Sequence, residues 1–434
     1  MSLEKYESQI SMMPIEYNQF LSPVKYGTMG QKQSIYQGSG SISMIPFLYN
    51  ANKWKKILLV IDPGVLKVGG ADSIIKTVEN AGFEYKIFSK IEPNPLEEDI
   101  VNVGLPMYRE MNADCMIAVG GGSTMDSAKG IAMIGESDLT IAECEKVSFM
   151  ANPYVDLPWK TYPIIAIPTT CGTGSEVIRN AVITEPNGHK GVLMHDCILP
   201  TYAIEDPDLL ASLPAHVAAA TVMDAFTQSV ESYVSNGATI FSATCGMKAI
   251  ELLGPNIVKY VRNPADKDAA DAISKGSMFG GFSWNGAFPC QIHGCNHPIT
   301  EVLHISHGDA CGILLPWFVE WNGENAREKF WKVHNAMYPD HQVCYKEFEI
   351  DDFVQKLMML NYDINLMNNM TMNDYVIWRG NPAGCTDETC NQIIDMQYHP
   401  LYTSPRKTSI QEMKDALIAV NNGDYIYKRR YLDK

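Results

Sequence analysis

Cys115-Met-Ile-Ala-Val-Gly-Gly-Gly-Ser123 is a short apolar run that passes directly into three glycines and a serine. An apolar run of this length, bounded by glycines, is typical of a buried strand. The segment Ser127-Ala-Lys-Gly-Ile-Ala132 behind it predicts the start of a helix. Bare backbone N–H groups and the positive end of a helix can hold a phosphate, so this stretch predicts a pyrophosphate site. A tight strand-to-helix turn without a ligand is the alternative interpretation.

Two further segments of the first half show the same pattern. Ile164-Ile-Ala-Ile-Pro168 runs into Thr169-Thr-Cys-Gly-Thr-Gly-Ser175, whose hydroxyls offer a second surface for phosphate or ribose. Ile57-Leu-Leu-Val-Ile61 predicts another strand, followed by a turn at Asp62-Pro63-Gly64 and a helix over residues 71–81. Strands that alternate with helices predict βαβ units and a parallel sheet.

The character of the chain changes at about Asp206-Pro207. From there on, β-branched runs give way to long helical patterns, such as residues 218–234 and 241–261. We therefore predict an α/β domain with a parallel sheet over residues 31–208, and an all-α domain over residues 209–434. Residues 1–30 have no clear periodicity, and we interpret them as an N-terminal extension.

The composition narrows the class of protein. The 434 residues exceed the size at which one core usually stops growing, in keeping with two domains. A formal net charge of −16 argues against nucleic acid as a partner and favours a small-molecule ligand. Eleven cysteines without a CxxC pair indicate reduced thiols of a cytoplasmic protein. The start of the chain does not resemble a signal peptide, and no run of 18 apolar residues predicts a membrane span.

Four of the ten histidines fall between His293 and His307. His293 and His297 are four residues apart and therefore project from one face of a helix, and a third histidine can return from a neighbouring element. In Asp224-Ala-Phe-Thr-Gln228, a carboxylate and an amide are spaced in the same way. Aspartate with histidines suits divalent iron or zinc. The alternatives are histidines that stabilise a core and an ordinary surface aspartate.

Asp62 follows the first of these strands. A carboxylate there can accept hydrogen bonds from a ribose diol and repel a 2′-phosphate, which predicts NAD rather than NADP. The same carboxylate could instead cap the helix that follows.

Taken together, these segments resemble the iron-containing, or group III, alcohol dehydrogenases. The matching segments occur in the order of that family and are Gly120-Gly-Gly-Ser-Thr-Met-Asp-Ser-Ala-Lys129, Pro168-Thr-Thr-Cys-Gly-Thr-Gly-Ser-Glu-Val177, Ala219-Ala-Thr-Val-Met-Asp-Ala-Phe-Thr-Gln228, His293 to Gly308, and Ser404-Pro-Arg-Lys-Thr408. The resemblance implies an NAD-dependent enzyme with an N-terminal α/β dinucleotide-binding domain, an all-α C-terminal metal-binding domain, a catalytic divalent metal and at least a homodimer.

The resemblance also implies roles for individual residues. Asp224, His293 and His307 match metal ligands, and His297 matches the histidine near substrate and nicotinamide. His304 matches no ligand. The residues that match positions holding the cofactor are Asp62, Gly120, Gly121, Gly122, Ser123, Thr169, Thr170, Thr173 and Lys190. Cys171, Trp284 and Cys290 are candidates for the pocket wall or for the core.

Two residues depart from the family pattern. Gln228 stands where a histidine ligand is typical, so it can coordinate through its carbonyl oxygen or leave that position to water. A glycerol-dehydrogenase-like site, with one aspartate and two histidines, shows that three protein ligands can suffice. Arg179 would clamp an anionic substrate if it points inward, and would be a surface charge if it points outward.

The predicted function is the NAD-dependent interconversion of an alcohol and its aldehyde or ketone. Fe²⁺ is the expected metal and Zn²⁺ the alternative, and the ion would polarise the substrate oxygen while His297 relays a proton. A sugar-phosphate lyase or cyclase similar to dehydroquinate synthase is a second hypothesis. A third is a non-catalytic NAD-binding protein whose metal site is degraded at Gln228.

Overall fold

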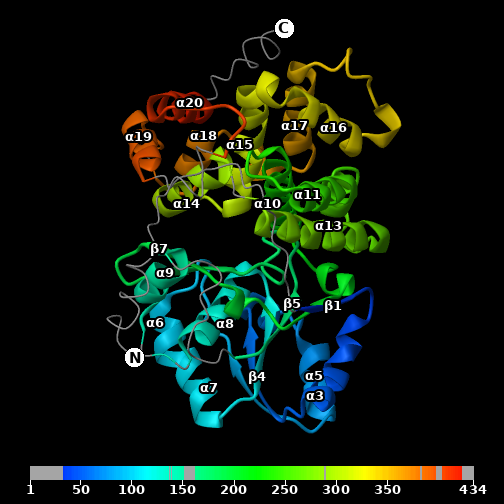
Figure 1. Ribbon diagram of the computed structural model, residues 1–434, viewed down its shortest axis with the longest axis vertical. Coiled ribbons are helices and arrows are strands. Elements are labelled where there is room, and N and C mark those ends of the chain that lie inside the picture. The colour runs from blue at the N-terminus through cyan, green and yellow to red at the C-terminus, as the bar shows by residue number, and fades with distance from the viewer. Residues whose placement is uncertain are drawn as a thin grey trace. The chain divides into compact units, whose positions relative to one another are not determined.

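The computed structural model describes residues 33–135, 137, 139–150, 162–287, 290–381, 384–396 and 403–422. The predicted extension over residues 1–30 lies outside these residues. The described chain forms two compact units, and it passes from the first to the second between Ser212 and Leu213 (Figure 1).

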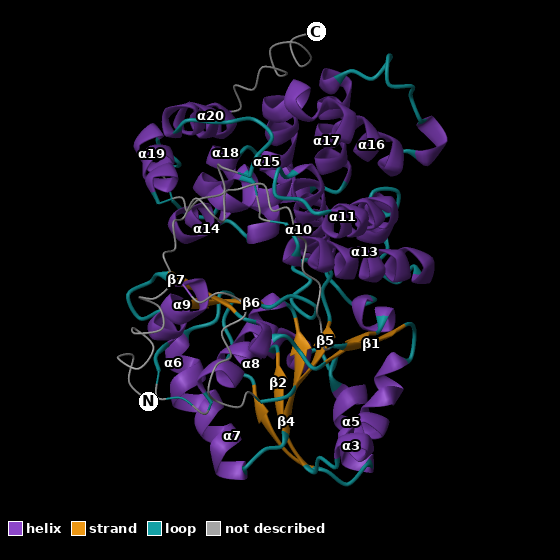
Figure 2. Ribbon diagram, in the orientation of Figure 1, coloured by secondary structure: helices purple, strands orange, loops and turns teal. Residues whose placement is uncertain are grey.

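A sheet of six parallel strands forms the centre of the first unit (Figure 2). In the order in which they lie side by side, the strands are β1 (Ser34–Gln37), β8 (Tyr202–Glu205), β5 (Ile164–Pro168), β4 (Cys115–Gly120), β2 (Lys56–Ile61) and β3 (Glu84–Phe88). The predicted strands over residues 57–61, 115–119 and 164–168 are confirmed as β2, β4 and β5. The prediction of a parallel sheet is confirmed as well.

Helices cover both faces of this sheet. Successive side chains of a strand point to opposite faces, so alternate apolar residues of each strand pack against helices on opposite sides. Met116 and Ala118 of β4 pack against α7 and α8, whereas Ile117 and Val119 pack against α3 and α5. The helices of this unit are α3 (Ile45–Asn52), α4 (Pro63–Lys67), α5 (Asp72–Asn80), α6 (Glu97–Asp99), α7 (Leu105–Met111), α8 (Gly122–Ile134) and α9 (Ile141–Met150). The antiparallel hairpin β6 (Asn180–Thr184) and β7 (Lys190–Met194) lies outside the sheet.

The order of the strands reverses between β2 and β4. The chain leaves β2 through α5 on one face and reaches β3 at the edge of the sheet, then returns across β2 to form β4. From β4 it leaves through α8 on the opposite face. The loops after β2 and β4 therefore diverge, and in open α/β sheets ligands bind at such a position.

Two local predictions were wrong about where a helix begins. Asp62-Pro63-Gly64 is the start of α4 rather than a turn, because Asp62 caps the helix and proline fits its first position. Helix α8 begins at Gly122 rather than at Ser127, so the glycine run itself enters the helix.

Every element in the described part of the second unit is helical (Figure 2), which confirms the predicted class. The helices are α10 (Ala215–Val234), α11 (Ile240–Leu253), α12 (Ile257–Arg262), α13 (Lys267–Asn285), α14 (Gln291–Leu303), α15 (His307–Asn322), α16 (Arg327–Met337), α17 (Ile350–Asp363), α18 (Met372–Trp378), α19 (Asp387–Asp395) and α20 (Ile410–Asn422). The single helix predicted over residues 241–261 is α11 and α12, because Pro255 after Gly254 has no N–H to continue a helix. Within the described ranges, no helix is sufficiently long and apolar to cross a bilayer.

Candidate active-site residues

The segments that follow β2, β4 and β5 meet at one edge of the sheet. Ile61 lies beside Val119, and Gly120 lies beside Pro168, so Asp62, Gly121 and Thr169 all follow at the carboxyl edge. The N–H of Thr169 donates to the carbonyl of Gly120 at 3.0 Å. The structure thus brings together residues on three separate loops for which the sequence predicts contacts with the cofactor.

The glycine run allows two of these loops to touch. A Cβ atom at Gly121 would lie 3.0 Å from Oγ1 of Thr170, and one at Gly122 would lie 2.8 Å from Cγ2 of Thr173. Gly121 is the N-cap of α8 and provides no side chain to satisfy the first N–H groups of that helix. The N–H of Thr124 donates to the carbonyl of Gly121 at 3.1 Å, whereas the N–H groups of Gly122 and Ser123, at the start of this helix of 13 residues, can receive an anionic group.

Ser123 and Lys190 are connected through Asn94. The N–H of Asn94 donates to Oγ of Ser123 at 3.3 Å, and Nζ of Lys190 donates to Oδ1 of Asn94 at 3.1 Å. Lys190 is the first residue of β7, so this chain of contacts holds the hairpin near the first turn of α8.

Asp62 has the capping role that the sequence left open. Its Oδ1 accepts hydrogen bonds from the N–H groups of Gly64 at 2.8 Å and Val65 at 3.0 Å. These contacts use one carboxylate oxygen and hold the side chain at the end of β2. A contact with ribose through the same carboxylate stays a prediction.

The second unit gathers a buried cluster of metal-binding groups. Asp224 of α10, His293 of α14, His307 of α15 and Cys311 each offer a ligand atom, and these atoms lie within 4.8 Å of one another. Oδ1 of Asp224 is 3.5 Å from Nε2 of His293 and 3.4 Å from Nε2 of His307. Three of the four predicted metal residues, Asp224, His293 and His307, are therefore close together.

The fold brings His307 back to the other ligands through a short reversal. Helix α14 ends at His304, whose backbone is left-handed with φ 54° and whose side chain is exposed. Ser306 then caps α15 by accepting a hydrogen bond from the N–H of Asp309 at 3.2 Å. His307 is the first residue of α15, and Nδ2 of Asn296 donates to its carbonyl at 2.8 Å.

Sequence reasoning missed Cys311, which belongs to this cluster, and Glu231, which contacts it through His293. Sγ of Cys311 lies 3.7 Å from Oδ1 of Asp224 and 3.9 Å from Nε2 of His293, and it accepts from Nδ2 of Asn296 at 2.9 Å. Glu231 is fully buried and hydrogen-bonds Nδ1 of His293, while its other oxygen accepts from the N–H of Ile292 at 2.8 Å. Cys311 is four residues after His307, and that spacing is a signal that could have identified it.

Other predicted residues of this unit are Gln228, His297 and Trp284. Gln228 is buried on α10, one turn after Asp224, and a Cβ atom at Gly280 would lie 3.1 Å from its Nε2. The ring centres of His297 and His307 are 5.5 Å apart, and those of Trp284 and His293 are 4.7 Å apart. His297 and Trp284 thus lie beside the cluster.

The charges of the cluster favour a bound cation. Burial alone would raise the pKa of Asp224, but the imidazoles of His307 and His293 hold that pKa well below its usual range. Burial would lower the pKa of His307, but Asp224 and Cys311 raise it to about 9. The carboxylate stays ionised and the imidazoles bind protons readily. A metal ion can take the place of these protons on the imidazoles. Because Glu231 orients His293, the cluster has the outer support that metal ligands require.

Three residues considered for the pocket wall or for substrate binding have other contacts. Nη1 of Arg179 lies 2.8 Å from Oδ1 of Asp196, and this pair is partly exposed, as expected of a surface charge. Cys290 caps α14, and its Sγ lies 3.7 Å from the carbonyl of Glu231. Cys171 is buried, and burial raises the pKa of its thiol.

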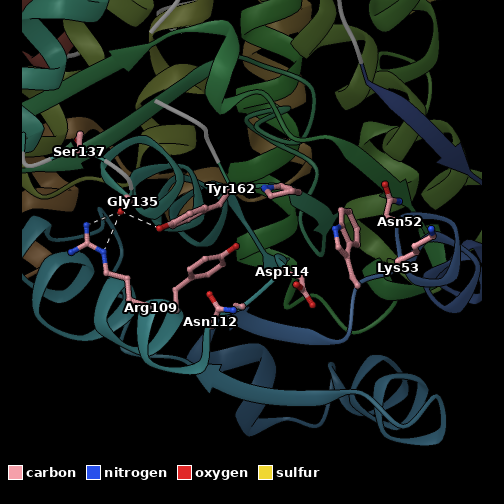
Figure 3. A pocket seen from close by; sticks show the side chains of 12 residues that line it. Asn52, Lys53, Arg109, Asn112, Asp114, Gly135, Ser137 and Tyr162 are labelled. Atoms are coloured by element: carbon pink, nitrogen blue, oxygen red, sulfur yellow. Dashed lines mark hydrogen bonds between the residues drawn. The ribbon is translucent and has the colours of Figure 1, made fainter. Parts of the chain in front are cut away.

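Figure 3 shows a pocket of about 630 Å³ at the opposite, amino end of the sheet. It is lined by Trp54, Asp114 and Pro163, which lie just before β2, β4 and β5. The guanidinium of Arg109 donates to the carbonyl of Gly135 at 2.6 and 3.1 Å. This pocket lies away from the glycine-rich loops, and none of the predicted site residues lines it.

Comparisons with known proteins agree with this arrangement. Residues 32–207 match the family described as "Iron-containing alcohol dehydrogenase", and residues 218–419 match "Fe-containing alcohol dehydrogenase family, C-terminal". The chain is similar to alcohol dehydrogenase 4 of Schizosaccharomyces pombe, with 33% identity over 67% of each chain. It is similar to 1,3-propanediol dehydrogenase of Klebsiella pneumoniae, with 32% identity over 69% of this chain and 76% of that protein. The crystal structure of a 1,3-propanediol oxidoreductase superposes with a TM-score of 0.80 and 27% identity, covering 91% of this chain and 100% of that one.

Proposed function

The chain belongs to the iron-containing alcohol dehydrogenase family, and from this we propose how its residues carry out the reaction. It is an NAD-dependent, metal-dependent oxidoreductase that interconverts an alcohol and its aldehyde or ketone. The observation that carries the proposal is the buried convergence of Asp224, His293 and His307.

We propose that the carboxyl edge of the sheet binds NAD. The N–H groups at the start of α8 would hold the pyrophosphate, supported by the close approach of the glycine and threonine loops. Asp62 would accept a hydrogen bond from the ribose diol through the oxygen that does not cap α4. The remaining residues proposed for cofactor binding are Gly120, Gly121, Gly122, Ser123, Thr169, Thr170, Thr173 and Lys190.

We propose that Asp224, His293 and His307 hold a divalent metal ion, Fe²⁺ in preference to Zn²⁺, with Gln228 as the fourth ligand through its carbonyl. Cys311 is the competing fourth donor, because its sulfur already lies beside Asp224 and His293. When bound, the ion supplies Lewis acidity that polarises the carbon–oxygen bond of the substrate, while NAD accepts the hydride.

His297 would carry the proton in this scheme. It is partly exposed, so its imidazole can exchange a proton with water, and its ring lies next to that of the proposed ligand His307. An imidazole ordinarily titrates near neutral pH, which suits transfer between the substrate oxygen and solvent. Trp284, whose ring contacts that of His293, would limit the access of bulk water to that side of the cluster.

The relatives favour this reaction over the two alternatives. The chain resembles alcohol and propanediol dehydrogenases at 32–33% identity, which supports release of NADH rather than internal recycling by a lyase. A non-catalytic protein would not need a buried donor cluster with an oriented histidine.

Three broader assignments complete the proposal. We propose that residues 31–208 bind the dinucleotide and that residues 209–434 bind the metal, in keeping with the division of the described chain at Ser212. We propose a cytoplasmic location from the eleven cysteines, for which the described residues show no disulfide. We propose a homodimer or a higher homo-oligomer from the family resemblance.

The proposed reaction is tested with anaerobically purified protein loaded with Fe²⁺ or Zn²⁺. We expect NADH to form when NAD and a short alcohol, such as ethanol, butanol or propanediol, are added, and NADH to be consumed with the matching aldehydes. The absence of NADH from every alcohol, in protein shown to contain metal, would contradict the proposal.

Replacing Gly120 with alanine should weaken the binding of NAD. The added Cβ would lie 2.3 Å from Oγ1 of Thr124 and 2.9 Å from Cβ of Asp62, so the loop must move. We expect the dissociation constant of NAD to rise roughly tenfold or more, or about 1.4 kcal/mol. Isothermal titration calorimetry measures it, with Gly323→Ala in the second unit as a control. An unchanged constant would place NAD elsewhere.

Replacing Gln228 with histidine should tighten the binding of metal. An imidazole is a better ligand than an amide oxygen for iron or zinc, so we expect the affinity for Zn²⁺ to rise by roughly tenfold or more. Competition with a chromophoric chelator measures this affinity. If the affinity of Gln228→His is unchanged while that of Cys311→Ser falls, residue 228 does not reach the ion and Cys311 is the fourth donor.

A further inference from the structure

The hairpin of β6 and β7 carries a glutamate and a histidine that face the same way. The N–H of Glu185 donates to the carbonyl of His189 at 2.8 Å, so these two residues close the hairpin opposite each other. Thr184 and Lys190 form the next pair along the ladder, and Ile183 and Gly191 form the pair after it. In a strand, alternate residues share one face, which places Glu185 with Ile183 and His189 with Gly191 on the buried face.

Helix α9 brings a second carboxylate to this face. α9 packs against β7 (Figures 1 and 2), and Oε1 of Glu145 accepts a hydrogen bond from the N–H of Val192 at 2.8 Å. The other oxygen of Glu145 lies 3.5 Å from Nε2 of His189. Glu145, Glu185 and His189 each have a ligand atom within 4.8 Å of those of the other two.

Glu185 is the unusual member of this cluster. Its side chain is 8% exposed, and its buried Oε1 has no hydrogen-bond partner among the described residues. Gly191 leaves room for this oxygen, since a Cβ there would lie 2.9 Å from it. A buried carboxylate oxygen without a partner costs free energy, and a second carboxylate nearby adds repulsion. Both costs disappear if a cation lies between the two glutamates.

We propose that Glu145, Glu185 and His189 bind a divalent transition-metal ion, separate from the ion at Asp224. Two carboxylates balance the charge of a divalent ion, and one imidazole favours zinc or a similar metal over magnesium or calcium. Ligands about 2.1 Å from a tetrahedral ion lie roughly 3.4 Å from one another. The distance of 3.5 Å between Glu145 and His189 already agrees with that spacing. Three protein ligands leave a fourth position for water.

The ion would fasten the hairpin to α9. Lys190, next to His189, reaches Asn94, and Asn94 in turn contacts Ser123 in the first turn of α8. The ion would thereby support a segment that we propose to lie beside the cofactor.

Zinc stoichiometry tests this proposal without reference to activity. Full-length protein is stripped with a chelator, dialysed against Zn²⁺ with excess Mg²⁺, and analysed for bound zinc. We expect two zinc ions per chain in the unaltered protein, one in Glu185→Gln and one in His189→Gln. His189 is partly exposed, so its replacement should leave the fold intact even if Glu185→Gln does not. His341→Gln, an exposed histidine outside both clusters, is the control and should keep both ions.

The Asp224→Asn variant separates this proposal from the proposed function. It should retain one zinc ion, and Asp224→Asn combined with His189→Gln should retain none. If Glu185→Gln and His189→Gln bind as much zinc as the unaltered protein, the second site does not exist. If they each lose one ion whereas Asp224→Asn loses none, the second site stands and the metal assignment at Asp224 fails.

Discussion

The Asp224→Asn enzyme should lose its bound catalytic metal and nearly all of its activity. Asp224 is the only carboxylate in the described donor cluster, and its Oδ1 lies within 3.5 Å of both imidazoles. An amide has no negative charge to offset a divalent cation in a buried site, so affinity for the ion falls. Loss of Lewis acidity is worth several kcal/mol, and we expect kcat/KM to fall by roughly 10³-fold or more.

Metal content and steady-state kinetics measured on the same sample check this result. Asp363→Asn is a matched control, because that aspartate makes an exposed ion pair with Arg262 at 3.3 Å and should leave both quantities unchanged. Glu231→Gln should give an intermediate loss of about 10–100-fold, because it weakens the support of His293 without removing a ligand. An Asp224→Asn enzyme that keeps its metal and its activity would show that the catalytic ion is bound elsewhere.

The Asp126→Asn variant should lose about 3–5 kcal/mol of folding free energy, because it removes the carboxylate that forms an ion pair with the buried Lys129. Lys129 is completely buried, and its Nζ donates to Oγ of Ser175 and to the carbonyl of Asn180, both at 2.7 Å. Oδ1 of Asp126 lies 3.9 Å from the same Nζ and accepts from Ser175 at 2.8 Å, while Oδ2 accepts from the N–H of Val182. This network ties α8 to the threonine loop and to β6.

The loss of stability should depend on pH. Burial lowers the pKa of Lys129 to about 8 in the folded protein, although the nearby Asp126 opposes that shift. The unfolded chain binds its lysine proton up to about pH 10.4, so between these values it holds more protons than the folded protein. Stability linked to this lysine therefore rises as the pH increases through that window. Without Asp126 the pKa falls further, the window opens at lower pH, and the gap between variant and unaltered protein narrows at alkaline pH.

Chemical denaturation at several pH values measures both effects. Lys86→Gln breaks an exposed ion pair with Glu110 and should cost at most about 1 kcal/mol at any pH. If Asp126→Asn is as stable as this control, the buried pair contributes nothing and the threonine loop is held by other contacts.

Most of the candidate site could be predicted because its signals are local. An apolar run followed by glycines predicts a strand and a phosphate-binding turn, and β4 with α8 confirms the strand and the helix. Four-residue spacings place Asp224 with Gln228, and His293 with His297, on single helices, as α10 and α14 show. Backbone geometry sets these spacings wherever a helix forms, so they need no knowledge of the rest of the chain.

The predictions that failed concern places where one residue outweighs the periodicity around it. Pro255 breaks a helix that the apolar pattern continues, and Asp62 starts a helix where the pattern suggests a turn. Both effects are readable from the sequence once capping and the missing N–H of proline are considered.

Residues distant in sequence acquired their roles only through packing. Glu231 contacts His293, which is 62 positions further along the chain, and Cys311 contacts Asp224, which is 87 positions earlier. Glu145 of α9 contacts His189 of the β6–β7 hairpin. The spacing of side chains along one helix or strand follows from its own backbone. The amino-acid sequence alone therefore establishes the alternation of strands and helices, the glycine-rich loops and the residues that share a face of one helix. Which helices lie against each other depends on the burial of many side chains at once. That collective fit brings Glu231 to His293, and brings Glu145, Glu185 and His189 together, in the folded protein.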